Sequence, residues 1–142
     1  MYKIVLLFLL LLSLNADEKF KESRYIYAIE KQIHYEGAIS FTEDLIEITY
    51  EKPKKENISY SRDDTLAYKR YFFTLLKAIY SEDETLLEEF FEIQKESQKT
   101  ILLPKERAQD YIKKVEFKKS KKGLDFLKIM MQNSDWILIE TL

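Results

Sequence analysis

The segment from Glu36 to Tyr60 alternates apolar and polar residues, and this alternation restricts the chain to few folds. Ile46, Ile48 and Tyr50 recur at every other position, and Pro53 ends their run. Period-two spacing of β-branched and aromatic residues is typical of strands with one buried face, and proline is excluded from central ladders. The segment therefore predicts three antiparallel strands that begin a curved sheet, over residues 37–41, 45–52 and 57–61, with a polar turn over 42–44.

The period changes between Tyr68 and Tyr80, where apolar residues recur every three or four positions. This spacing predicts a helix with a broad apolar face. Ser81 and Glu84 fit the S-x-x-E capping box, which predicts a second short helix running to Glu92. Residues 17–22 are charged and are predicted to be frayed. The other alternating runs predict strands over 91–94, 100–103, 112–120, 124–131 and 136–142, which bring the total to eight. A strand over 24–35, where a helix is the alternative, would make nine, and residues 66–68 are a further short candidate.

The N-terminal residues have the pattern of a secretory signal peptide. Lys3 precedes the apolar run Ile4–Leu12, and the small residue Ala16 follows. The run is shorter than the roughly 20 residues that span a bilayer. We therefore expect residues 1–16 to be removed and residues 17–142 to form one periplasmic domain. The chain has no cysteine, so neither a disulfide nor a lipidated cysteine is expected.

Residue types that carry catalysis are scarce in this sequence. His34 is the only histidine and there is no cysteine, which argues against a zinc site or a Cys–His pair. His34 has no obvious acidic partner and is interpreted as a structural or surface residue. The net charge of −2 provides no long-range attraction for nucleic acid. A carboxylate pair stays open, but the sequence predicts no enzyme, no metal and no cofactor.

Large apolar residues exceed what a small core requires. Ile137–Ile139 is apolar on both strand faces, and aromatic residues make up 14% of the chain. One interpretation is an ordinary β-sandwich core. The other is a curved sheet whose concave face holds an acyl chain, with the helices as a lid. Burial of about fifteen methylenes at roughly 0.8 kcal/mol each would suffice for binding. The candidate cavity residues are Phe41, Ile46, Ile48, Tyr50, Tyr60, Phe72, Leu75, Leu76 and Ile79.

A lysine cluster lies in the C-terminal third of the chain. One expectation is that it faces anionic head groups or the acidic surface of a partner. The alternative is that these lysines form a solvated strand face and turn. The members of the cluster are Lys113, Lys114, Lys118, Lys119, Lys121 and Lys122.

Several loose patterns follow one another along nearly the whole chain after residue 16. They are Glu36-Gly37, residues 46–50 with Pro53, residues 58–60 with 63–66, the helices over 71–79 and 84–92, Thr100–Lys105, and residues 112–142. Their order resembles the LolA-like outer-membrane lipoprotein carriers, and Thr100–Lys105 is the best match. One difference is that residues 38–42 contain no arginine, where the carriers have one.

The resemblance implies a mainly β fold, a half-open antiparallel β-barrel covered by two short helices. It implies a monomeric periplasmic carrier that takes acylated lipoproteins from an inner-membrane transporter to an outer-membrane acceptor. Two alternatives stay open: a LolA-like protein that binds another lipid or glycolipid, and a periplasmic protein-interaction module. A carrier predicts a connected apolar cavity under the helices that is lined by some of the nine candidate residues, whereas an interaction module predicts a filled core and an exposed apolar patch.

Overall fold

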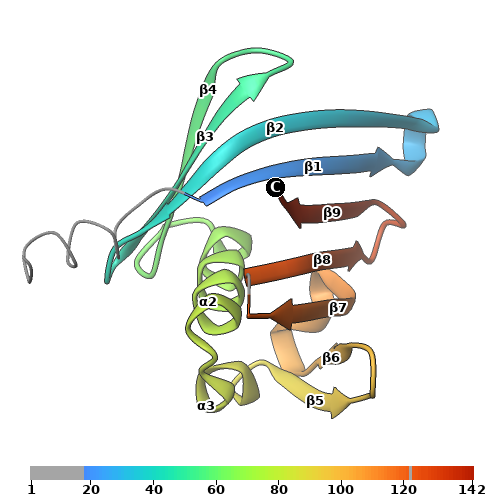
Figure 1. The fold of residues 1–142 in the computed structure, drawn as a ribbon. Coiled ribbons are helices and arrows are strands. Elements are labelled where there is room, and N and C mark those ends of the chain that lie inside the picture. Colours follow the sequence, from blue (N-terminus) through green and yellow to red (C-terminus); the bar gives the residue numbers. More distant parts are fainter. Residues whose placement is uncertain (1–17, 122) are drawn as a thin grey trace, which may run out of the picture.

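The computed structural model describes residues 18–121 and 123–142, and it is mainly β (Figure 1). The predicted signal peptide lies outside these residues. Nine antiparallel strands form one sheet in the order β4-β3-β2-β1-β9-β8-β7-β6-β5. Within the described chain the sheet is not closed, because β4 and β5 lie at its two ends. The strands are β1 (Glu18–Ile26), β2 (Lys31–Phe41), β3 (Leu45–Lys52), β4 (Glu56–Ser61), β5 (Phe91–Lys95), β6 (Thr100–Pro104), β7 (Ile112–Ser120), β8 (Gly123–Met131) and β9 (Trp136–Thr141).

The predicted three-stranded segment is confirmed as β2, β3 and β4. Thr42 donates its backbone N–H to the carbonyl of Leu45 and thereby closes the turn between β2 and β3. Gly37 lies opposite Tyr50 at a register shift, where a Cβ atom would come within 2.4 Å of the Thr49 carbonyl oxygen. Only glycine allows the two backbones to approach this closely.

The first two strands differ from the prediction. Residues 24–35 are not one strand, because a 3₁₀ turn over Tyr27–Ile29 divides them, and Glu30 has a left-handed φ of 50°. The described part of the segment predicted to be frayed belongs to β1 instead. Phe20 explains this order, since its side chain is only 1% exposed and anchors β1 in the core.

The helical pair is confirmed, with different bounds and a different cap. Helix α2 covers Ala67–Ser81 and α3 covers Glu84–Glu88. The predicted strand over 66–68 is wrong, because Leu66 is the N-cap of α2. The predicted capping box is also wrong. Ser81 ends α2 and donates its hydroxyl to the carbonyl of Lys77, while the Asp83 carboxylate caps α3 by accepting from the Leu86 N–H.

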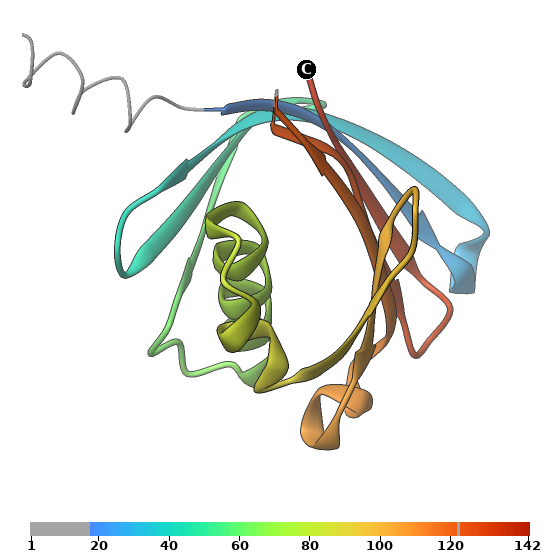
Figure 2. The same cartoon turned by 60° about the horizontal axis from the view of Figure 1, so that its bottom comes forward.

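The sheet curves around α2, which lies on its concave side (Figure 2). The buried face of α2 supplies Phe73, Leu75 and Ile79 to the core. These side chains join a cluster of buried residues that includes Ile46, Leu102 and Leu127 from the sheet.

The C-terminal strands β5 to β9 are confirmed close to their predicted bounds, with a 3₁₀ turn over Glu106–Asp110 inside the charged connection. β9 pairs with β1, so that Arg24 lies opposite Ile137 and the two halves of the chain form one continuous sheet. None of the helices in the described residues has the length and apolar character needed to cross a bilayer.

Candidate functional site

A cavity of about 440 Å³ lies between the N-terminal half of α2 and the concave face of the sheet. Its walls come from both halves of the chain, because β1 and β9 pair at the centre of the sheet. The lining residues are Glu22, Arg24, Ile48, Tyr50, Ile58, Tyr60, Tyr68, Lys69, Phe72, Leu76, Ile129, Met131, Ile137 and Ile139.

Most of this lining is apolar, and strand register explains which residues face inward. Ile129 of β8 lies opposite Ile137 of β9, and Ile139 lies opposite Glu22 of β1. Because side chains alternate between the two faces of a strand, one set of alternate positions forms a single wall. Leu76 of α2 lies on the facing wall. A half-open pocket of this size and character is within the range of small-molecule binding sites, which measure about 300–1,000 Å³.

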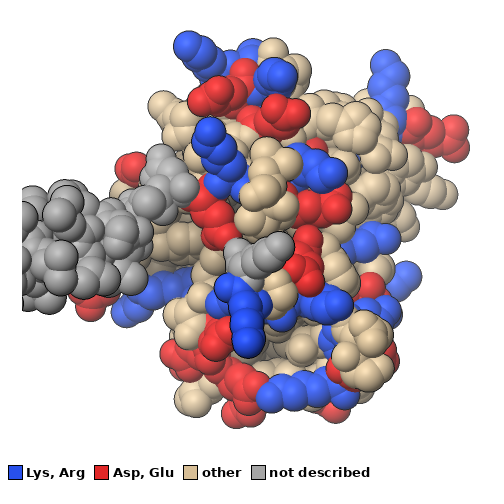
Figure 3. All heavy atoms as spheres, viewed as in Figure 1, with Lys and Arg blue, Asp and Glu red and all other residues tan. Residues whose placement is uncertain are grey.

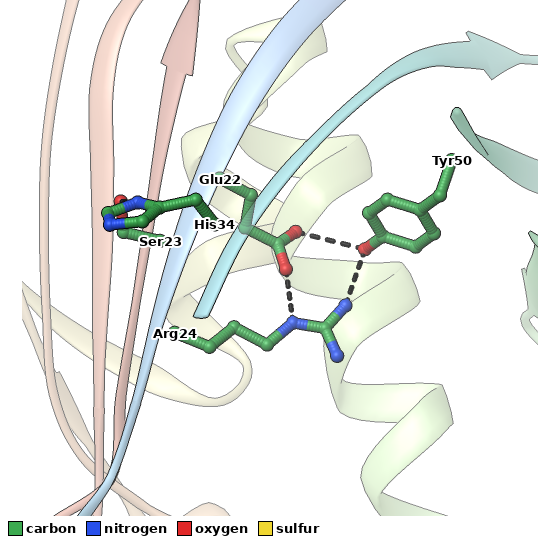
Figure 4. Close-up of polar contacts among 5 residues, drawn as sticks. All are labelled: Glu22, Ser23, Arg24, His34 and Tyr50. Atoms are coloured by element: carbon green, nitrogen blue, oxygen red, sulfur yellow. Dashed lines mark hydrogen bonds and ion pairs between the residues drawn. The ribbon is translucent and has the colours of Figure 1, made fainter. Parts of the chain in front are cut away.

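One end of the cavity is polar. The alternation that points Phe20 inward also points Glu22 and Arg24 inward from β1. The Glu22 carboxylate accepts from Nε of Arg24 and from the Tyr50 hydroxyl, the latter at 3.0 Å, and Nη2 of Arg24 donates to the same hydroxyl at 2.7 Å (Figure 4). Glu22 is only 4% exposed, so its charge depends on these partners.

The electrostatics of this polar end follow from burial and from the ion pair. Burial of the guanidinium disfavours its charged form and acts to lower the pKa of Arg24. The interactions with Glu22, Tyr50 and Tyr35 are together stronger, so the pKa of Arg24 is raised. Burial, followed by the Glu22 charge, raises the pKa of Tyr50 and of Tyr60. Both tyrosines therefore keep their hydroxyl protons at neutral pH and can donate hydrogen bonds.

The nine predicted cavity residues divide among four environments. Ile48, Tyr50, Tyr60, Phe72 and Leu76 line the cavity. The other four do not, since Ile79 lines a second cavity of about 350 Å³, Ile46 and Leu75 are fully buried, and Phe41 packs against Tyr80 with ring centroids 4.5 Å apart.

The two cavities lie at different ends of α2 and share no lining residue. Between them along α2, Leu75 is fully buried and belongs to the hydrophobic core.

The lysine cluster also divides. Lys119 points inward and donates to the carbonyl oxygens of Ile79 and Tyr80 at the end of α2. Lys114 forms an ion pair with Glu116 at 2.8 Å. Lys122 lies outside the described residues, and the remaining members, Lys113, Lys118 and Lys121, are exposed or half-exposed. On the face shown in Figure 3, positive and negative side chains are interspersed.

His34 lies away from the cavity. Its side chain is exposed on the opposite side of the β1–β2 pair from Glu22, with Nδ1 3.1 Å from the Ser23 hydroxyl (Figure 4). This placement agrees with its interpretation as a surface residue.

Glu22 and Arg24 were not among the site residues predicted from the sequence. The available signal was the alternation of Phe20, Glu22 and Arg24, which places all three on one strand face. Treating the residues before Arg24 as frayed concealed this pattern.

Comparison with known proteins provides no identification. No protein-family model matches the sequence, and no curated protein matches it significantly.

Proposed function

We propose that this protein binds the acyl chain of an amphiphile in the cavity beside α2 and carries it through an aqueous compartment. In this proposal the curved sheet is a half-open β-barrel and the helices are its lid. The function is non-catalytic, because shielding an acyl chain requires only binding and release. The observation that carries the proposal is a mainly apolar enclosure on the concave face of the sheet, with polar groups at one end.

The size of the cavity supports a single chain. If a methylene occupies about as much space as a water molecule in the liquid, roughly 30 Å³, fifteen methylenes need roughly 450 Å³. The cavity of about 440 Å³, which is partly open to solvent, is of the same order. At roughly 0.8 kcal/mol per buried methylene, transfer of such a chain from water would stabilise the complex by about 12 kcal/mol before the costs of association.

The cargo implied by the sequence resemblance is an acylated lipoprotein. On that basis the protein is a monomeric periplasmic carrier that moves lipoproteins from an inner-membrane transporter to an outer-membrane acceptor. The second candidate cargo is a free single-chain lipid. The buried Glu22–Arg24 pair favours this cargo, because a polar group at the end of an apolar cavity suits a lipid head group.

A cavity-filling substitution tests the proposal. Leu76 is a poor choice, since it is 2% exposed and a larger or charged side chain would disturb the core. Ile58 lies on the edge strand β4, is half-buried and lines the cavity. We expect Ile58→Trp to reduce affinity for a fluorescent acyl probe at least about tenfold, because the indole occupies the volume of the chain.

The matched control is Ile93→Trp on β5, which places the same side chain in the second cavity. Thermal unfolding verifies that both variants are folded. Equal affinity of wild type and Ile58→Trp would contradict binding in this cavity. Loss of affinity only in Ile93→Trp would move the site to the other end of α2.

A further inference from the structure

We propose that the polar end of the cavity binds the carboxylate of a long-chain fatty acid, with Arg24 as its main ligand and Lys69 as a second cation. This inference rests on the proposed acyl-chain binding and specifies its cargo. The resemblance to lipoprotein carriers does not imply it, because acyl chains attached to a protein end in ester or amide groups without a negative charge.

Arg24 is held in place while part of its hydrogen-bonding capacity stays free. Its Nε donates to Glu22 and its Nη2 donates to Tyr50, and its guanidinium lies 4.1 Å from the ring centroid of Tyr35. The remaining nitrogen, Nη1, has no hydrogen-bond partner among the described residues and points away from both partners in Figure 4. A guanidinium fixed in this way loses little entropy when it binds a carboxylate.

The charges around the cavity favour one negative charge on the ligand. Only Glu22, Arg24 and Lys69 among the lining residues are charged, and their sum is +1. Lys69 forms no ion pair within the described residues, and its Nζ lies 5.8 Å from the ring centroid of Tyr60. A carboxylate would balance this charge. A phosphate monoester, with about −1.5 to −2 charges at pH 7, would place excess negative charge beside buried Glu22.

The remaining polar groups at this end also suit an acceptor ligand. The Tyr60 hydroxyl keeps its proton, since burial raises its pKa. No hydrogen bond of this hydroxyl occurs within the described chain. Apart from these groups and the hydroxyls of Tyr50 and Tyr68, the lining is apolar and leaves room for the hydrocarbon chain.

The test is isothermal titration calorimetry with delipidated protein and three ligands of equal chain length: a saturated fatty acid, its primary alcohol and its methyl ester. Concentrations stay below the onset of micelles. We expect the acid to bind at least about tenfold more tightly than the alcohol or the ester, because charge-assisted hydrogen bonds to the guanidinium are lost with either.

Two variants test the roles of Arg24 and Lys69. Arg24→Lys keeps the charge beside Glu22 and is expected to retain the fold, but it lacks the forked donor and should weaken acid binding about tenfold. Lys69→Met should weaken acid binding about two- to fivefold. Either variant should narrow the difference in affinity between the acid and the alcohol. Lys54→Met, which removes an exposed lysine in the turn between β3 and β4, is the control and should change neither affinity.

The outcomes separate the two proposals. Equal binding of acid, alcohol and ester would overturn carboxylate recognition and support acyl-chain binding. Tighter binding of an alkyl phosphate than of the acid would also overturn the carboxylate assignment. Absence of binding by all three ligands would overturn both proposals.

Discussion

At the scale of single residues, the Glu22 carboxylate stands out because it is a charged group buried inside the fold. A buried charge without partners costs several kcal/mol, and removal of one member of a buried pair typically destabilises a protein by about 3–5 kcal/mol. Glu22 avoids this cost because both of its oxygens accept hydrogen bonds, from Arg24 and Tyr50. A well-packed apolar pair would stabilise the core as well or better. Stability alone therefore does not account for the ion pair, which leaves room for the binding role that we propose.

Glu116 provides a pH-dependent contribution to stability. Its carboxylate accepts from Lys114 at 2.8 Å and from Lys99 at 3.2 Å. The hydrogen bond from Lys114, opposed by partial burial and supported by Lys99, lowers the pKa of Glu116 below its ordinary value of 4.5. A lowered pKa means that the stabilisation is present above about pH 4.5 and is lost as the pH falls through the pKa of the folded state.

We therefore expect Glu116→Gln to reduce the free energy of unfolding at neutral pH and to flatten its decline below about pH 4.5. Urea unfolding over a series of pH values measures both effects. Glu47→Gln, on the exposed face of β3, is the control for loss of one negative charge. If the free energies of unfolding of wild type and Glu116→Gln fall in parallel with pH, the contacts of Glu116 with Lys99 and Lys114 do not contribute to stability.

Some residue roles follow from the sequence and others do not. The inward position of Arg24 follows from its alternation with Phe20, once the strand is known. The role of Lys119 does not, because its acceptors on Ile79 and Tyr80 lie about forty positions earlier in the chain. Lys119 looks like any other lysine of its strand until α2 is placed beside β7.

At the scale of elements, α2 depends on neighbours at both ends. The Asp64 carboxylate accepts from the N–H of Leu66 just before the helix. At the other end, Lys119 donates to two terminal carbonyls, where a positive charge also interacts favourably with the helix dipole. The helix that forms one wall of the cavity is therefore anchored to a loop on one side and to β7 on the other.

The cap of α3 provides a test at this scale. Because Asp83 accepts from the Leu86 N–H at 3.1 Å, Asp83→Ala should lower the free energy of unfolding by about 0.5–2 kcal/mol. Ser81→Ala is the matched variant two residues earlier. It removes a hydrogen bond within α2 and leaves the cap of α3 intact. Urea unfolding gives the free energy of unfolding of both variants. A larger effect of Ser81→Ala would favour the capping box that the sequence alone predicts.

Elements with strong periodicity were predicted well. The three strands β2, β3 and β4 and the helix α2 have unambiguous periods of two and about 3.6 residues. The turn between β1 and β2 was missed because Glu30 adopts a left-handed conformation that glycine or asparagine would usually mark. The α3 cap was assigned to the wrong residue because Ser81 and Asp83 are both good capping residues, and only the end of α2 decides between them.

At the scale of the whole molecule, the cavity exists because a strongly curved sheet and one helix do not fill the space between them. The sequence predicts a mainly β sheet with two helices, but not the pairing of β9 with β1 that joins its two halves. It also could not separate packing residues from lining residues. Leu75 and Leu76 are adjacent and equally apolar, yet only Leu76 lines the cavity.

The most direct test of the proposed function is native mass spectrometry of the protein purified from the cells that produce it, without delipidation. We expect one lipid or acylated peptide bound to each chain, released as the protein is activated in the gas phase. Its mass would identify the cargo as a fatty acid or as a lipoprotein fragment. A mass equal to that of the bare chain, together with no binding of a fluorescent acyl probe, would contradict the carrier and favour a protein-interaction module.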